Sequence, residues 1–311
     1  MTGVLEEIGG KLAERWVSLL ALPGLLFLGV VWAGHTLGPG SFFSTELLTD
    51  DVERAAAWVD RHGSAGLFLA LVGVLGAAVV PGLAVRVGAE VLATVWLGDW
   101  PAGPLVRRRQ KRRALADAEV QAQVVALGVA EDRQRQDEIK AARDAMREAE
   151  VRRDNIALVV PARATRMGDR VHAMEERVQR YYRVPLGLLW PRVWLTASEP
   201  QRVEVRETAG AFDASTRLGA WGLLYVVGGA ATLWWPASAA GAVAVAASWW
   251  TGRQRLFALA DLVESLVDLR IGPVARMVGV ASKDGPLPEV VGDELNLLMK
   301  RLRLPREPEA P

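Results

Sequence analysis

Cysteine is absent from the 311-residue sequence, and histidine occurs only three times, at widely separated positions. The absence of cysteine excludes disulfide bonds, thiolate nucleophiles and thiolate metal ligands, and the scattered histidines form no zinc-binding pattern. Walker A loops, dinucleotide-binding glycine fingerprints, nucleophile elbows and H-E-x-x-H motifs are absent as well. The sequence therefore predicts no catalytic, cofactor-binding or metal-binding residues, and we expect a protein that is not an enzyme.

Charge of either sign is missing from three long stretches, although the whole chain carries 37 basic and 36 acidic residues. These stretches are residues 16–37, 64–85 and 218–252. A hydrocarbon core of about 30 Å is crossed by roughly 20 helical residues, so the first two stretches each predict one spanning helix. Pro81, near the end of the second stretch, predicts a kink there.

The third uncharged stretch holds 35 residues and has Pro236 near its middle. One straight helix of that length would be about 50 Å long, which is too long for an ordinary bilayer. We therefore expect two short helices that reverse direction in the sequence WWPASAAG. The predicted fold class is all-α: an integral membrane protein with four transmembrane helices in two pairs and a cytoplasmic helical or coiled-coil-like module between them.

A basic run, RRRQKRR, follows the second predicted span closely. Cationic segments beside spanning helices stay in the cytoplasm, and they attract anionic lipid headgroups by about 1 kcal/mol per cation. Nucleic acid is the alternative partner of such a run, but the position beside a membrane helix favours lipid. The predicted topogenic and lipid-binding residues are Arg107, Arg108, Arg109, Lys111, Arg112 and Arg113.

The basic run, with further arginines on both sides of the predicted hairpin, places the N-terminus and the C-terminus in the cytoplasm. The high content of Ala, Arg and Val is typical of a GC-rich bacterial genome. We therefore expect a multi-pass protein of a bacterial cytoplasmic (inner) membrane.

Tryptophan is unusually frequent, with twelve residues against three tyrosines. Several indole rings fall near the predicted membrane boundaries, which is typical of an aromatic belt. The alternative interpretation is that they are ordinary core residues. The predicted interfacial anchors are Trp190, Trp194, Trp234, Trp235, Trp249 and Trp250.

Changes in composition divide the chain into four segments. Residues 1–100 are predicted to form a transmembrane pair with an extracytoplasmic loop at 38–63. The remaining segments are a cytoplasmic helical module (101–217), a transmembrane hairpin (218–252), and a cytoplasmic C-terminal helix with a partly disordered tail (253–311).

Apolar residues recur at helical spacing in the cytoplasmic module. Those at positions 139, 142, 146 and 149 are three and four residues apart, which predicts either a coiled-coil seam or a helix hairpin packed within one subunit. A second amphipathic helix is predicted in TRMGDRVHAMEERVQRYY. The apolar residues 184–195 that follow are too short and too rich in proline to span a bilayer. They are expected either to lie among the inner headgroups or to form a buried connector.

Asp261, Glu264 and Asp268 lie on one face of a helix predicted at 256–271. Anionic lipid would repel such an acidic stripe. We therefore expect this helix to pack against an arginine-rich surface of the cytoplasmic module.

Arg86 and Glu90 follow the second uncharged stretch and are the most specific candidates for function. Ionised groups inside a bilayer cost about 2.5–3.5 kcal/mol on insertion scales, and those that occur often line ion paths. The alternative, which the sequence favours, places Arg86 at the inner headgroups with Glu90 as its i,i+4 partner. Glycines at 73, 76 and 82 additionally predict close helix packing, within or between subunits.

A motif precedes the predicted hairpin, formed by Arg166, Gly168, Asp169, Glu175, Arg177, Tyr182, Trp190, Pro191 and Arg192. In this motif and the hairpin, residues 164–250 resemble a group of uncharacterised multi-helix membrane proteins of bacteria, common in actinobacteria. The resemblance implies that this segment and the hairpin form one recurring unit. It brings no activity and no functional residues.

These features favour a membrane-anchored helical scaffold or interaction protein. The alternative is an oligomeric ion channel or transporter with Arg86 and Glu90 at its cytoplasmic mouth. The expected partners are the lipid bilayer, anionic lipid headgroups, and further copies of the chain through small-residue helix faces or the helices of 105–183. Nucleic acid and cofactors are not expected.

Overall fold

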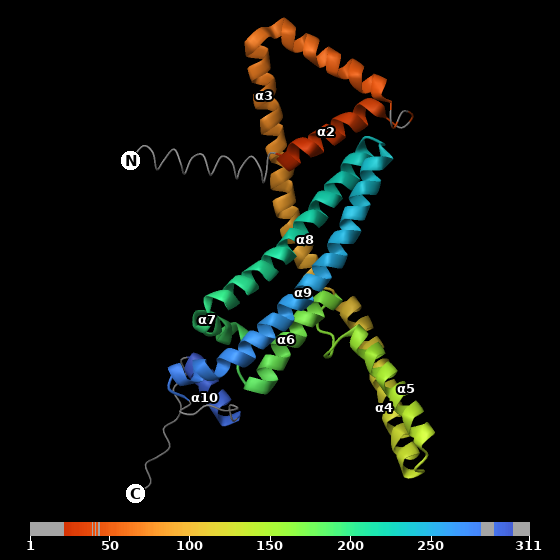
Figure 1. Cartoon of the computed structure of the whole chain (residues 1–311), viewed down its shortest axis with the longest axis vertical. Helices are drawn as coiled ribbons and strands as arrows, with labels where there is room; N and C mark the ends of the chain where they lie inside the picture. The colour runs from red at the N-terminus through yellow and green to blue at the C-terminus, as the bar shows by residue number, and fades with distance from the viewer. Residues whose placement is uncertain (1–21, 39, 41, 43, 281–288, 301–311) are drawn as a thin grey trace. The chain divides into compact units, whose positions relative to one another are not determined.

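The computed structural model describes residues 22–38, 40, 42, 44–280 and 289–300, and within these ranges the backbone forms nine α-helices and no strand (Figure 1). The predicted all-α class is therefore confirmed. In chain order the helices are α2 (Leu22–Leu37), α3 (Thr45–Leu97), α4 (Gly103–Asp132), α5 (Gln136–Ile156), α6 (Arg166–Tyr182), α7 (Leu186–Thr196), α8 (Glu199–Ala231), α9 (Trp235–Met277) and α10 (Glu289–Met299).

The chain divides into two compact units. Unit 1 comprises residues 1–93 and 212–252, and unit 2 comprises residues 94–211 and 253–311. Helices α3, α8 and α9 each contribute residues to both units.

Among the described residues, α3 is the one helix that is long and apolar enough to cross a membrane. Only 22 % of its most apolar window is buried. Helix α2 is apolar but has 16 residues, and residues 16–21 of the first predicted span lie outside the described part of the chain. The uncharged part of α8 is short, and that of α9 is rich in alanine, glycine and tryptophan. One candidate span is therefore found where the sequence predicts four.

The segment predicted as an extracytoplasmic loop, residues 38–63, is helical from Thr45 to His62. Its alanines and its acidic first turn favour a helix. The break in α3 lies at Gly63, whose φ of 60° and ψ of −152° belong to a region open mainly to glycine. Helix α3 continues through Pro81 with helical torsions, and its break in torsions is at Gly63.

In unit 1, α8 and α9 form a hairpin that reverses at residues 232–234, at the start of the WWPASAAG sequence (Figure 1). The two backbones pack closely because glycines face each other. A Cβ on Gly222 would lie 2.8 Å from the Gly241 carbonyl oxygen, and one on Gly241 would lie 2.6 Å from the Gly222 carbonyl oxygen. Such contacts between small residues are typical of helices that associate in lipid.

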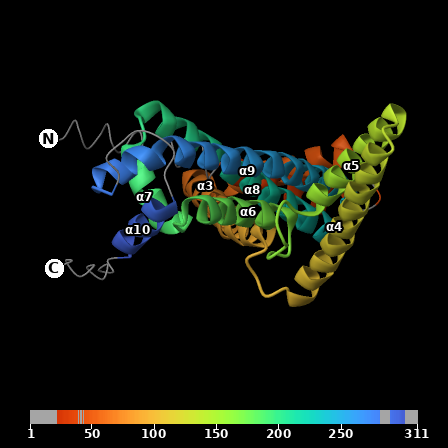
Figure 2. The same ribbon diagram turned by 90° about the horizontal axis from the view of Figure 1, so that it is seen from below.

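In unit 2, α4 and α5 form a second hairpin and lie side by side in both ribbon views (Figures 1 and 2). Helix α4 buries Ala116, Val120 and Ala130, and α5 buries Ala149. The apolar stripe at 139–149 therefore packs within the subunit, as the hairpin alternative predicts.

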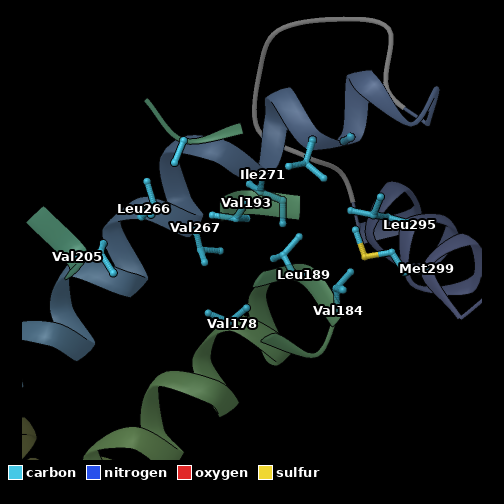
Figure 3. Close-up of a cluster of buried hydrophobic side chains, with 13 residues drawn as sticks. Val178, Val184, Leu189, Val193, Val205, Leu266, Val267, Ile271, Leu295 and Met299 are labelled. Atoms are coloured by element: carbon cyan, nitrogen blue, oxygen red, sulfur yellow. The ribbon is translucent and has the colours of Figure 1, made fainter. Parts of the chain in front are cut away.

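The remaining helices of unit 2 surround a hydrophobic core that draws on five elements (Figure 3). Helix α6 contributes Val178, α7 contributes Leu189 and Val193, and α9 contributes Val267. Helix α10, which the proline-rich C-terminal sequence does not predict, adds the fully buried Leu295. This core fixes the C-terminal part of α9 against α6 and α7.

Candidate functional site

The predicted pair Arg86 and Glu90 lies on α3 in unit 1, where both side chains are exposed. They line a polar pocket of about 240 Å³ together with Asp213, Thr216 and Arg217 of α8. The pocket therefore combines two pairs of opposite charge, each spaced i,i+4 on its own helix. Sequence reasoning found the α3 pair but not Asp213, because nothing local indicates that α8 packs beside it.

The basic run at the start of α4 is divided between two environments. Arg107, Arg108, Lys111 and Arg112 are exposed, as a lipid-binding role requires. The other two predicted residues, Arg109 and Arg113, point into unit 2.

Arg113 is 8 % exposed and makes ion pairs with Asp117 at 3.4 Å and Asp154 at 3.6 Å. Arg109 donates from Nε and Nη2 to Oδ2 of Asp169, at 3.1 and 2.6 Å. It also donates to the Ile156 carbonyl at 2.8 Å. Arg113 therefore ties α4 to α5, whereas Arg109 holds the α4–α5 hairpin to α6.

Asp169 is a buried carboxylate with all its acceptor capacity directed to protein groups. Its second oxygen, Oδ1, accepts the backbone N–H groups of Ala162 and Arg163 at 3.0 and 2.9 Å. A buried charge is tolerated when it is paired and hydrogen-bonded in this way. Asp169 therefore fixes the loop before α6 and the start of α4 at the same point.

The last turn of α3 is attached to the start of α6. Thr165, the N-cap of α6, accepts a hydrogen bond from the Gly168 N–H at 3.0 Å and donates its hydroxyl to the Trp96 carbonyl. Gly168 lies against the Leu97 carbonyl so closely that a Cβ would overlap the oxygen and lie 2.8 Å from the carbon. We call Thr165, Gly168 and Asp169, with Trp96, Leu97 and Arg109, the junction.

The junction contains functional candidates that sequence reasoning left without a role. Gly168 and Asp169 belong to the motif that carries the family resemblance, and the structure supplies a physical reason for both residue types. Thr165 directly before an amphipathic helix is a recognisable N-cap signal that the sequence offered. Its partner Trp96 is 69 residues away and had no signal.

The acidic stripe of α9 packs against arginines of α6 in unit 2, as the sequence predicts. Arg170 donates to Glu264 at 2.7 Å, and Arg177 bridges Glu264 and Asp268, the latter at 3.0 Å. Hydrogen bonding to Glu264 raises the pKa of Arg177. The ion-pair ladder consists of Arg170, Arg177, Asp261, Glu264 and Asp268.

Tyr182 extends this ladder at the end of α6. Its hydroxyl donates to Oδ1 of Asp268 at 2.8 Å. Burial, together with the charge of Asp268, raises the pKa of the Tyr182 hydroxyl well above its ordinary value. The phenol is thus held protonated as a hydrogen-bond donor.

Residues 184–195 form α7 and its approach, and one side of this segment is buried while Leu195 is exposed. Val184, Leu189 and Val193 are fully buried. The predicted anchors Trp190 and Trp194 pack against the same core and also line an apolar cavity of about 750 Å³, with ring centroids 5.8 Å apart.

The other predicted anchors lie in unit 1. Trp234 donates its Nε1–H to the Phe42 carbonyl at 3.1 Å, and the ring of Trp235 meets the Phe42 ring edge-on at 6.0 Å. Trp249 and Trp250 of α9 expose about half of their surface. Among the described residues, no group of three or more metal-ligand side chains is placed to hold an ion.

Comparison with models of protein families, with curated proteins and with solved structures finds no match to this chain. The resemblance to bacterial membrane proteins therefore stays a prediction.

Proposed function

We propose that this chain is a membrane-anchored helical interaction protein of a bacterial inner membrane. In this proposal unit 1 lies in the bilayer with four spanning segments, unit 2 is a cytoplasmic module, and both termini face the cytoplasm. The proposal includes the anchoring roles of the exposed cations of α4 and of the tryptophans in the hairpin.

The observation that carries the proposal is the exposed apolar surface of α3. Large apolar side chains are exposed along its length, and a soluble protein rarely leaves so continuous an apolar surface in water. A helix also pairs most of its backbone hydrogen-bonding groups internally, which is what a lipid environment requires. The exposed residues are Leu67, Phe68, Leu69, Leu71, Val72, Val74, Leu75, Val80, Leu83, Val87, Val91 and Val95.

Exposed apolar residues on the other helices of unit 1 support the additional spans. Helix α2 exposes Leu22 and Leu26, α8 exposes Leu223 and Val227, and α9 exposes Val243. Close packing between the glycines of α8 and α9 is further support, because small residues replace the hydrophobic effect as the basis of helix association in lipid.

The α4–α5 hairpin supports the interaction role. Outside its own contact face, α4 exposes Leu115 at 73 % and Val125 at 67 %. Exposed apolar side chains that form a patch are typical of protein–protein contacts, and Val125 is accompanied by the exposed Val124 and Val129. The junction fastens this hairpin and the end of α3 to α6, so a partner bound on α4 would be held at the membrane.

Membrane insertion is tested by extraction and by reporters. We expect the chain to stay in the membrane pellet at alkaline pH and to require detergent for solubility, and reporters fused to either end to be active in the cytoplasm. Solubility without detergent would overturn the anchoring proposal.

The interaction role is tested by placing a photo-crosslinking residue at Leu115 or Val125 in native membranes. We expect a discrete adduct with another protein from both positions. The same residue at Lys140, an exposed position on α5, is the control and should give none. Identical adducts from all three positions, or none from any, would contradict the proposal.

The second candidate function is an ion channel or transporter, and the charged pocket around Arg86 and Glu90 favours it. In this alternative the pocket, with Asp213 and Arg217, forms the cytoplasmic mouth of a path in an oligomer. Purified protein in liposomes should then conduct ions, and Glu90→Gln should change the ion selectivity, whereas Glu53→Gln should not. No conductance across several salts and pH values would eliminate this candidate.

A further inference from the structure

A second pocket of unit 2, distinct from the apolar one beside α7, lies between α5, the start of α6 and α9. Its volume is about 320 Å³, at the lower end of the roughly 300–1,000 Å³ that small-molecule sites occupy. Val151, Leu158 and Phe257 supply apolar lining, and Asn155 and Arg166 supply polar lining. The pocket thus presents both polar and apolar groups.

The acidic side chains of this pocket are already neutralised. Asp169 accepts the guanidinium of Arg109 at 2.6 Å. Asp154 accepts from Arg153 at 2.9 Å and lies 3.6 Å from Arg113. Neither carboxylate offers free negative charge to a cation in the pocket.

Arg166 differs from the other arginines of this region in its partners. Its guanidinium donates to the amide oxygen of Asn155 at 3.1 Å and lies 5.8 Å from the centroid of the Phe257 ring. Both partners are uncharged. Arg170, in the same pocket, is by contrast paired with Asp261 and Glu264.

The charged groups that act on Arg166 are also positive, so they do not neutralise its guanidinium. Desolvation by burial, followed by the charges of Arg253 and Arg109, lowers the pKa of its guanidinium. A partly buried cation among like charges is stabilised by an anion, and a guanidinium fork matches the geometry of phosphate and carboxylate oxygens.

We propose that this pocket is an oxyanion-binding site in which Arg166, oriented by Asn155 and Phe257, binds a phosphate group, and in which Val151 and Leu158 contact the apolar part of the molecule that carries it. The phosphate belongs either to a free phosphate ester or to a lipid headgroup, because both present the same oxygens.

The test is a titration of the full chain in phosphatidylcholine nanodiscs with sodium phosphate, at constant ionic strength set with sodium chloride, followed by the thermal unfolding temperature. We expect saturable stabilisation. Arg166→Gln should weaken the apparent phosphate affinity at least tenfold. The control Arg133→Gln removes the same charge from an exposed position at the end of α4, outside the basic run, and should change the affinity less than twofold.

A second variant keeps the test decisive if Arg166→Gln fails to fold. Val151→Trp fills the pocket mouth from an exposed position without removing a charge, and it should abolish the stabilisation. Equal phosphate affinity in the parent protein and in Val151→Trp would overturn the proposal, as would equal affinity in Arg166→Gln. So would stabilisation by phosphate no greater than by chloride.

A parallel series in phosphatidylglycerol nanodiscs identifies the source of the phosphate. If the site takes a lipid headgroup, the anionic lipid should already occupy it, and added phosphate should give less than half of the stabilisation seen in phosphatidylcholine. If it takes a free phosphate ester, the stabilisation should be the same in both lipids. The site stands in either case.

Discussion

The carbonyl group of Leu97 lies directly against the Cα of Gly168, with no space for a side chain between them. This contact joins the last residue of the apolar helix α3 to the first turn of α6, and Asp169, the next residue, pairs with Arg109 at the start of α4. Three segments of unit 2 are therefore positioned by two consecutive residues.

Replacing Gly168 by alanine should destabilise unit 2 by about 3 kcal/mol, the upper end for overpacked sites, because its Cβ would meet the Leu97 carbonyl and lie 2.9 Å from the Cβ of Arg163. Thermal unfolding in detergent measures the effect. Gly128→Ala is the control: nothing lies within 4 Å of its Cβ position, and alanine in an open helical site should be neutral or stabilise by up to about 1 kcal/mol. Equal unfolding temperatures for the two variants would contradict the contact.

Asp169→Asn should cost about 3–5 kcal/mol of stability, because it leaves Arg109 without its buried counter-charge. The exposed Asp144 on α5 provides the control, and Asp144→Asn should change the free energy of unfolding by less than about 0.5 kcal/mol. Denaturant titration distinguishes the two. The structural role of Asp169 is wrong if both variants unfold at the same denaturant concentration.

Two carboxylates of the ion-pair ladder should contribute differently to the free energy of unfolding because they differ in burial. The Glu264 side chain is 12 % exposed between two arginines, whereas that of Asp261 is 70 % exposed. We expect Glu264→Gln to cost about 3 kcal/mol and Asp261→Asn less than about 1 kcal/mol. Raising the salt concentration should weaken only the smaller effect. The reverse order of the two costs would contradict the arrangement of α6 against α9.

Tyr182 should make stability depend on alkaline pH. Folding raises the pKa of its hydroxyl above the ordinary value of 10.0, so the unfolded chain loses this proton first as the pH rises. The stabilisation is fully present below pH 10 and decreases as the pH rises toward the folded pKa. Tyr182→Phe should reduce the fall in unfolding temperature above pH 10, and Tyr181→Phe, at an exposed tyrosine, should retain it. An identical pH slope in both variants would exclude this role.

The features that the sequence predicts correctly depend on patterns that span only a few neighbouring residues. Stripes at spacings of three and four identify the helices around Met174 and Ile139, and Pro236 marks the hairpin reversal. Arginine partners for Glu264 could be expected from charge alone, since an acidic stripe requires them. These inferences succeed because each needs only a few neighbouring residues.

The features that sequence reasoning missed depend on distant contacts. Arg109 and Asp169 are 60 residues apart. No residue near either one indicates that part of the basic run would form ion pairs inside the fold. Glycine positions show the same limit. Gly73 and Gly76, predicted to pack closely within or between subunits, have no atom of their own chain within 4 Å of a Cβ position, whereas Gly24 lies against the Ala78 backbone. Composition indicates that small residues pack somewhere, but the choice among them requires the fold.

On the proposal that the exposed cations of α4 attach the protein to anionic lipid, the division of the basic run changes the electrostatics of that attachment. Arg109 and Arg113 are paired inside the fold, so four of the six cations face outward. At about 1 kcal/mol for each cation near an anionic surface, the folded protein retains roughly 4 of the 6 kcal/mol that the bare sequence suggests. A nascent chain that has not yet reached Asp117 lacks all of these partners, so it still presents all six cations. On this proposal, the attraction that orients α3 during insertion is therefore stronger than the attraction that remains once synthesis is complete.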